Sequence, residues 1–155
     1  MNKGADYITK EKKEELELEL KELRGPKRMD ILAKLDYAKS LGDLSENAEY
    51  HQVREDQAKL EARIQKIELI LKSSEIISGG GGDIVEVGSK VLVQKEGSDE
   101  EKVYQIVGSE EADMLVGKIS NKSPIGMALY GRKKGDKISF KTPNGIVYYK
   151  IINVY

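Results

Sequence analysis

Residues 50–71 read YHQVREDQAKLEARIQKIELIL, and apolar side chains recur in this stretch at alternating steps of three and four residues. This spacing places one stripe along a helix and is typical of a coiled-coil seam. One seam position is polar, and charged residues fill the outer faces. The seam consists of Tyr50, Val53, Gln57, Leu60, Ile64, Ile67 and Leu71. The stretch therefore predicts a long helix that packs against a partner helix.

A partner stripe lies earlier in the chain and has one irregularity. Its members are Leu16, Leu20 and Leu23, followed by Ile31, Leu35 and Ala38. The step from Leu23 to Ile31 is eight residues, one more than a heptad, and Gly25-Pro26 lies within it. Proline removes a helix hydrogen bond and clashes with the preceding turn. We expect a kink or a phase shift there, with the helix continuing beyond it.

The two stripes are joined by only a few residues, so the helices must pack antiparallel to bury them. Each arm has about 30 residues and would extend roughly 45 Å at the rise of an α-helix. Residues 1–78 are therefore predicted to form an antiparallel two-helix coiled coil. A hairpin of this kind buries little apolar area for its length, which suggests that its length provides reach.

The chain changes character after Ser78. Gly79 to Gly82 form a run of four glycines, which cannot continue a helix and indicates a flexible joint. Beyond it, short runs of β-branched residues and tyrosine predict strands at 90–94, 102–107, 116–120, 137–141 and 145–154. We expect an α+β protein with a coiled coil over 1–78 and a small β-rich domain over 79–155.

Two local signals refine the second domain. Pro143-Asn144-Gly145 predicts a hairpin turn, because Asn-Gly is able to take positive φ. Ser123-Pro124 predicts the start of a short helix, with serine at the N-cap, proline at the first helical position and Gly131 after its end.

Composition excludes several classes of function. The absence of cysteine rules out a disulfide scaffold and a thiolate metal site, and a single histidine, His51, cannot form a histidine cluster. Because 26 Lys and Arg face 27 Asp and Glu, the chain is not a strongly basic nucleic-acid binder. No apolar stretch approaches the length of a membrane span, and residues 1–6 do not resemble a signal peptide. We expect a cytoplasmic protein with no membrane partner.

The connection between the predicted helices is acidic. It contains Asp43, Glu46 and Glu49. Helix capping explains part of this pattern, because Gly42 can end the first helix and Asp43 or Ser45 can cap the second. Asp43 and Glu46 also have the spacing of a capping box. Capping needs only one acid, however, and an exposed carboxylate pair could instead complete the oxygen shell of a Mg²⁺ ion held by another molecule. Spacing alone favours capping.

A longer motif makes the second interpretation specific. The connection and the helix after it read Gly42-Asp43-Leu44-Ser45-Glu46-Asn47-Ala48-Glu49-Tyr50, then Arg54-Glu55-Asp56-Gln57 and Arg63-Ile64. The second domain adds Ile106-Val107-Gly108, Glu111-Ala112-Asp113, Ser123-Pro124-Ile125, Gly135-Asp136 and Lys141-Thr142-Pro143-Asn144-Gly145. In this order, over nearly the whole chain, the motifs resemble the GreA/GreB family of bacterial transcription factors.

The resemblance implies a coiled coil followed by a domain of FKBP-like fold. It also implies binding to bacterial RNA polymerase, with the coiled coil passing down the secondary channel to the RNA 3′ end of backtracked complexes. Asp43 and Glu46 would then be the catalytic tip acids, holding a Mg²⁺ ion jointly with the polymerase. The chain would be an activator of cleavage by the polymerase rather than an enzyme. We expect it to be a monomer that binds no Mg²⁺ stably by itself.

The resemblance also implies roles for five further residues. Lys39 and Arg54 match basic residues that guide the RNA 3′ end, although a solvated helix face would explain both equally simply. Lys39 replaces the more usual arginine and so lacks its bidentate fork. With few basic residues near the acids, the chain resembles GreA-type members more than GreB-type members. Lys122, Ser123 and Pro124 match the loop that docks on the polymerase, and Lys122 departs from the acid or amide common there.

Three other functions remain to be separated from this one. A channel-binding inhibitor would keep the polymerase partner, but inhibitory relatives have altered tips. A prolyl isomerase needs an aromatic-lined pocket, for which the second half offers only Phe140 and several tyrosines. A non-catalytic coiled-coil adaptor or chaperone would keep its function after Asp43 is neutralised.

Overall fold

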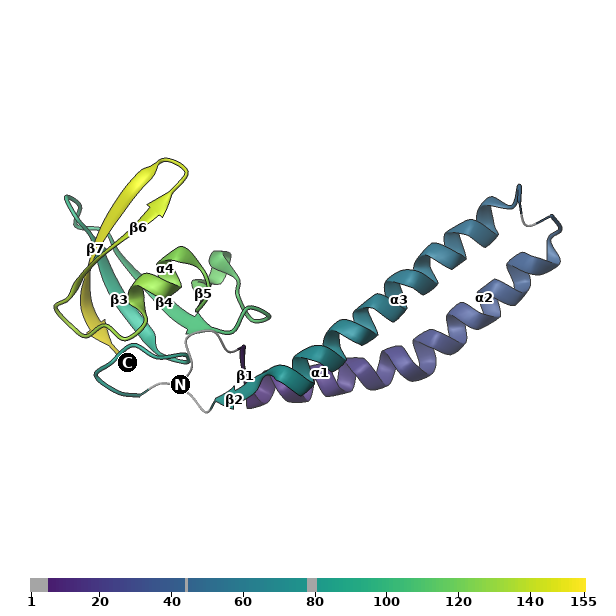
Figure 1. The fold of residues 1–155 in the computed structure, drawn as a ribbon, viewed down its shortest axis with the longest axis horizontal. Coiled ribbons are helices and arrows are strands. Elements are labelled where there is room, and N and C mark those ends of the chain that lie inside the picture. The colour runs from purple at the N-terminus through teal and green to yellow at the C-terminus, as the bar shows by residue number, and fades with distance from the viewer. Residues whose placement is uncertain (1–5, 44, 78–80) are drawn as a thin grey trace. The chain divides into compact units, whose positions relative to one another are not determined.

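A computed structural model describes residues 6–43, 45–77 and 81–155 (Figure 1). The chain forms two compact units, one made of Met1–Lys12 and Ser74–Tyr155 and the other of Lys13–Ser73. The predicted boundary between 78 and 79 falls on residues outside the described ranges, so that boundary stays a prediction. The predicted order of a helical hairpin followed by a β-rich domain is confirmed.

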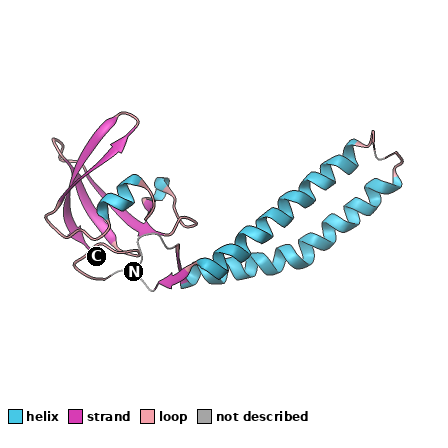
Figure 2. Ribbon diagram, viewed as in Figure 1, coloured by secondary structure: helices cyan, strands magenta, loops and turns pink. Residues whose placement is uncertain are grey.

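The helical unit is a hairpin (Figure 2, cyan). Its first arm contains α1 (Lys10–Glu22), a π-helical turn (Leu23–Lys27) and α2 (Arg28–Ser40), and its second arm is α3 (Ala48–Ser73). The buried side chains are the ones that the two stripes predict: Leu16, Leu35, Ala38, Val53, Leu60, Ile64 and Ile67. Burying each large aliphatic side chain contributes about 1.5–3 kcal/mol, so this seam holds the hairpin together.

The π-helical turn explains the eight-residue step in the first stripe. The Arg28 amide donates to the carbonyl of Leu23, five residues earlier, as well as to that of Gly25. A π-turn accommodates one residue more than an α-helical turn of the same rise. The extra residue shifts the phase by one position while the helix continues through Pro26 into α2. The predicted phase shift is thus confirmed and has a defined geometry.

Three arginine–glutamate pairs join the arms beside the seam. Arg28 contacts Glu61 through two bonds, Nε to Oε1 at 2.9 Å and Nη2 to Oε2 at 2.7 Å. Arg63 holds Glu19 in the same bidentate manner at 2.7 and 2.8 Å. Arg24 pairs with Glu68. Parallel double bonds fix the relative positions of two side chains more tightly than a single contact does.

The globular unit is built on a five-stranded sheet with the order β5-β4-β3-β7-β6. The strands are β3 (Lys90–Lys95), β4 (Glu101–Val107), β5 (Lys118–Ser120), β6 (Lys137–Thr142) and β7 (Gly145–Val154). All neighbours are antiparallel except β4 and β5, which run parallel. The five predicted strands are confirmed with one correction. Val116 belongs to a 3-10 turn, Met114–Val116, that Asp113 caps and Gly117 ends at φ 75°.

A short helix, α4 (Pro124–Leu129), covers part of the sheet (Figure 1). Ile125 and Leu129 of this helix are buried together with Val91, Ile106 and Ile151 of the sheet. Ser123 caps the helix by accepting a hydrogen bond from the Gly126 amide, and Gly131 follows its end at φ 77°. The capped helix predicted from Ser123-Pro124 and Gly131 is therefore confirmed.

The hairpin between β6 and β7 turns where the sequence predicts it. Thr142 pairs with Gly145, so Pro143 and Asn144 occupy the turn. Gly145 takes φ 123°, whereas Asn144 is not at positive φ. Proline fixes its own φ near −65°, which suits the first central position of an ordinary turn and leaves the unusual conformation to glycine. The predicted hairpin turn is confirmed, and within Asn144-Gly145 the glycine alone takes positive φ.

Two strands were not predicted. β1 (Tyr7–Thr9) and β2 (Glu75–Ile77) pair in parallel. Tyr7 is only 1% exposed and belongs to the core of the globular unit. The Thr9 amide and hydroxyl both donate to the Glu111 carboxylate, at 3.1 and 2.8 Å. Strands of three residues are too short to produce a periodic signal in the sequence.

Candidate functional site

The acidic loop lies where α2 gives way to α3, at one end of the helix pair (Figure 1). α2 ends at Ser40, and the Leu41 amide makes a last bond to the Ala38 carbonyl at 3.2 Å. Gly42 follows at φ 125°, a conformation that glycine adopts without strain. Glycine thus ends the first arm as predicted and turns the chain into the loop.

Asn47, rather than Asp43 or Ser45, caps the second helix. Its Oδ1 accepts a hydrogen bond from the Tyr50 amide at 3.0 Å, the bond that defines an N-cap. Its Nδ2 donates to the Ala38 carbonyl at 2.6 Å. One side chain therefore satisfies an amide at the start of α3 and a carbonyl at the end of α2. The predicted capping roles of Asp43 and Ser45 are wrong, because the loop is longer than the prediction assumed.

The Asp43 side chain makes hydrogen bonds within the loop instead of capping the helix. Its Oδ1 accepts from the Ser45 amide at 3.0 Å and from the Ser45 hydroxyl at 2.9 Å. These two donors, the amide first, lower the pKa of the Asp43 carboxyl from its usual value, since both favour the ionised form. Asp43 is exposed, and its other oxygen faces no described partner. The carboxylate is thus ionised, oriented and accessible.

Glu46 is exposed one residue after Ser45. Within the described residues, no hydrogen bond or ion pair holds its carboxylate. Neither of the two acids is used by the helix caps, so capping no longer explains their presence. Leu44, between them, lies outside the described residues.

The donor set of the loop fits a hard divalent cation only in part. Mg²⁺ prefers six oxygen ligands and is usually held by one or two carboxylates plus water or phosphate. Asp43 and Glu46 supply carboxylate oxygens of the right kind. Across the described ranges, no group of three potential metal-ligating side chains occurs. The loop can therefore contribute to a Mg²⁺ site that another molecule completes.

Basic residues flank the loop on both arms. Lys39 lies in the last turn of α2 and Arg54 lies in α3, and both are exposed. Arg54 Nη1 donates to the Gln57 side chain at 2.9 Å, along its own helix. Each arm thus presents one cation within two turns of the acids. A role for either residue toward RNA stays a prediction.

Two ring-bearing residues begin α3. Tyr50 is half-buried at the head of the seam, and its ring meets that of His51 edge-on, with centroids 5.7 Å apart. His51 Nε2 lies 3.5 Å from the Ser45 carbonyl. Both rings therefore pack at the base of the loop.

The predicted docking loop lies on the globular unit, between β5 and α4. Ser123 Oγ donates to the Ser120 carbonyl at 2.7 Å and also caps α4, so the loop is firmly held. Lys122 forms an ion pair with Asp6 at 2.5 Å, and both side chains are more than 40% exposed. Pro124 occupies the first turn of α4. The positive charge of Lys122 is thus offset by the segment that precedes β1.

Two family models match this chain. The one described as "Transcription elongation factor, N-terminal" covers residues 6–76, and the one described as "Transcription elongation factor, GreA/GreB, C-term" covers residues 80–155. Within the described ranges, no helix is both long enough and apolar enough to cross a membrane.

Curated relatives match over nearly their whole length. The transcription elongation factor GreA of Clostridium acetobutylicum is 46% identical over 149 residues, which cover 95% of this chain and 94% of the relative. The GreA of Streptococcus pneumoniae serotype 4 is 44% identical, with 95% and 93% covered. Among solved structures, the GreA factor homolog 1 (Gfh1) of Thermus thermophilus is 29% identical with a TM-score of 0.44, covering 97% of this chain and 99% of that one.

Proposed function

Because this chain belongs to the GreA/GreB family of transcription elongation factors, we propose that it inserts its helical hairpin into the secondary channel of RNA polymerase and stimulates Mg²⁺-dependent cleavage of backtracked RNA. The observation that carries this proposal is that neither Asp43 nor Glu46 caps a helix. Both carboxylates are exposed at the end of the hairpin, and Asn47 alone performs the cap.

The geometry supports distinct roles for the residues of the loop. Ser45 fixes one oxygen of Asp43 and keeps the carboxylate ionised, which leaves the second oxygen to reach a cation. Glu46 provides a second exposed carboxylate. When bound, Mg²⁺ activates water and stabilises negative charge on the phosphate in an in-line displacement. The two acids would complete its oxygen shell and orient the attacking water, while the polymerase supplies the rest of the site.

The helical hairpin would deliver these acids. The seam and the bidentate Arg28–Glu61 and Arg63–Glu19 pairs restrain the two arms against each other, and Asn47 ties them at the loop. A stiff projection loses little conformational entropy when it enters a channel. Lys39 and Arg54 would then meet the phosphates of the extruded RNA 3′ end, and Lys122, Ser123 and Pro124 would contact the polymerase rim.

The test uses a stalled, backtracked elongation complex that carries end-labelled RNA. Wild-type protein should shorten the transcript, and Asp43→Asn or Glu46→Gln should strongly slow shortening at a Mg²⁺ concentration below saturation while polymerase binding persists. Asp36→Asn is a matched control, because Asp36 is an exposed acid of α2 outside the loop. Shortening should be unchanged in that variant.

Three outcomes would count against this proposal. Wild-type protein that binds the polymerase without shortening RNA would favour a channel-binding inhibitor. Shortening that keeps its wild-type rate in both variants would show that the loop acids do not act in cleavage. A cellular function that needs no acid at position 43 would favour a coiled-coil adaptor or chaperone.

A further inference from the structure

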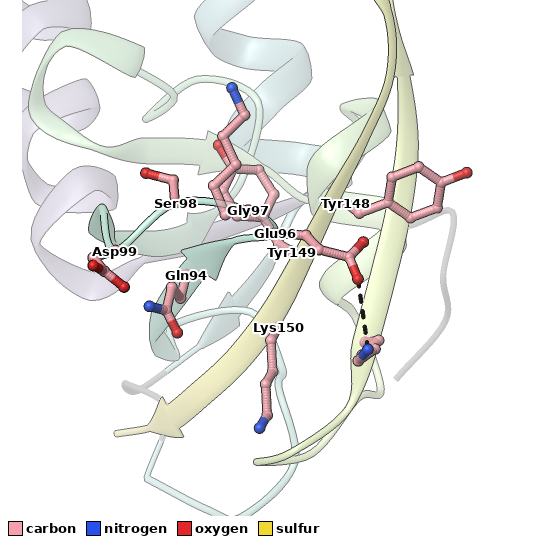
Figure 3. A pocket seen from close by; sticks show the side chains of 10 residues that line it. Gln94, Glu96, Gly97, Ser98, Asp99, Tyr148, Tyr149 and Lys150 are labelled. Atoms are coloured by element: carbon pink, nitrogen blue, oxygen red, sulfur yellow. Dashed lines mark ion pairs between the residues drawn. The ribbon is translucent and has the colours of Figure 1, made fainter.

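The globular unit carries a hollow that has no part in the proposed cleavage function. Its volume is about 390 Å³, and it is formed by the β3–β4 turn and by β6 and β7 (Figure 3). Volumes from about 300 to 1,000 Å³ are typical of sites for small molecules. The hollow is thus large enough for a ligand of nucleotide size.

Two lysines on neighbouring strands line this hollow. Lys137 of β6 and Lys150 of β7 are cross-strand partners, and Gln94 of β3 is the partner of Lys150 on its other side. Like charges directly opposite each other destabilise a sheet. Lys137 pairs with Glu96 across 3.6 Å, with both side chains more than half exposed (Figure 3). In the described part of the chain, Lys150 forms no ion pair. Three lysines and two acids, Glu96 and Asp99, line the hollow, so its lining carries a small excess of positive charge.

An exposed tyrosine, Tyr148, lines the same hollow as these lysines. Tyr148 is 51% exposed and lies two residues from Lys150 along β7, on the same face of the strand. Tyr148 also lines a second hollow of about 410 Å³, together with Asn144 and Ile146. An exposed tyrosine ring with open space beside it offers a surface on which a planar base can stack.

We propose that this hollow binds a nucleotide, with its phosphate between Lys150 and Lys137 and its base against Tyr148. A phosphate monoester carries about −1.5 to −2 charges at neutral pH, which matches two opposed ammonium groups better than a single carboxylate does. Glu96 would release Lys137 to the phosphate, since their contact is long and solvent-exposed. The nucleotide is either free or part of a single-stranded RNA, because both present the same phosphate and base.

The test is an NMR titration of the full-length ¹⁵N-labelled protein with four probes. These are adenosine monophosphate, adenosine, inorganic phosphate and a short single-stranded oligoribonucleotide. Adenosine monophosphate should shift the amides of residues 94–99, 137 and 148–150 and should bind more tightly than adenosine or phosphate alone. Tighter binding of the mononucleotide than of the oligonucleotide identifies a free nucleotide as the ligand, and the reverse identifies an RNA strand.

Substitutions separate the two contacts. Lys150→Gln should weaken binding by about tenfold through loss of the charged phosphate contact. Tyr148→Ala should weaken it by about fivefold or more through loss of stacking. The matched control is Lys141→Gln, since Lys141 is an exposed lysine of β6 that does not line the hollow. Asp43→Asn should bind the nucleotide as the wild type does, which keeps this test independent of the cleavage proposal.

The proposal is overturned if adenosine monophosphate and the oligonucleotide shift none of these amides. Equal binding of adenosine and its monophosphate would also overturn it, because the phosphate would then contribute nothing. So would equal weakening by Lys150→Gln and Lys141→Gln, which would indicate a diffuse charge effect. Thermal unfolding of each variant verifies that a loss of binding is not a loss of fold.

Discussion

Asn47 Nδ2 donates a hydrogen bond of 2.6 Å to the carbonyl oxygen of Ala38, and this bond ties the end of one helical arm to the start of the other. The last carbonyls of a helix and the first amides of the next have no partners within their own helices. Asn47 satisfies one group of each kind. Neither Asp43 nor Glu46 is therefore needed as a helix cap.

Substitutions of Asn47 can separate its two roles. Asn47→Ser keeps an N-cap oxygen but is too short to reach Ala38, so only the bond between the arms is lost. Asn47→Ala loses both, and we expect it to cost about 1 kcal/mol more than serine does in the free energy of unfolding. Urea denaturation followed by circular dichroism measures the difference. Equal stability of the two variants would show that Asn47 does not cap α3.

Ser45 controls the ionisation of Asp43. Ser45→Ala removes the hydroxyl donor but keeps the amide, so the pKa of Asp43 should rise part of the way toward its usual value. NMR titration of the carboxyl carbon measures it. Ser40→Ala is the control, since the Ser40 hydroxyl donates to the Tyr37 carbonyl and not to Asp43.

The lowered pKa of Asp43 also determines how the stability of the loop depends on pH. Asp43 has a lower pKa folded than unfolded, so its ionisation favours the folded loop above the unfolded pKa. That contribution is lost as the pH falls through the folded pKa. As the pH is lowered, the Ser45→Ala variant should therefore lose its stimulation of cleavage at a higher pH than the wild-type protein does. Identical acidic limbs in the two pH profiles would separate Asp43 ionisation from activity.

The Arg28–Glu61 pair should stabilise the hairpin modestly. Arg28→Ala removes both the charge and the two parallel bonds. Both side chains are about 40% exposed, so a double-mutant cycle with Glu61→Gln should give a coupling free energy of roughly 0.2–1 kcal/mol. The coupling should shrink in 1 M salt, where screening acts over about 3 Å. A coupling that grows with salt would contradict an electrostatic origin.

Gly108 provides the space in which β1 lies. A Cβ atom at this position would overlap the backbone of Tyr7, which cannot move aside as a flexible side chain could. Gly108→Ala should therefore lower the free energy of unfolding by about 1–3 kcal/mol. Gly25→Ala is the contrasting variant, because no neighbouring atom lies within 4 Å of the added Cβ. Alanine there should be neutral or should stabilise the helix by up to about 1 kcal/mol.

The long helices could be predicted because their apolar residues recur at regular spacing. The seam from Tyr50 to Leu71 repeats its apolar positions over several turns, and the irregularity of the first stripe at Gly25-Pro26 could be located in advance. The geometry of the loop could not be predicted in the same way. Asp43, Ser45 and Asn47 are all favoured N-cap residues, and only the tertiary contact between Asn47 and Ala38 selects among them. β1 depends on contacts with Gly108 and Glu111, roughly a hundred residues away.

The identities of the site residues came from a motif and not from periodicity. Spacing alone favoured a capping role for Asp43 and Glu46, and that interpretation was wrong in structure. The hollow beside Lys150 gave no signal in the sequence, because Lys137 and Lys150 become neighbours only through the register of β6 and β7.

The central claim is that the loop acids help to hold Mg²⁺ during RNA cleavage. The most direct test measures the single-turnover cleavage rate of a backtracked complex as a function of Mg²⁺ concentration, with saturating wild-type protein or Glu46→Gln. Losing one of two carboxylate ligands should raise the half-saturating Mg²⁺ concentration by about tenfold or more, with partial recovery of the rate at high Mg²⁺. An unchanged Mg²⁺ dependence in Glu46→Gln, whether or not the maximal rate falls, would contradict the claim.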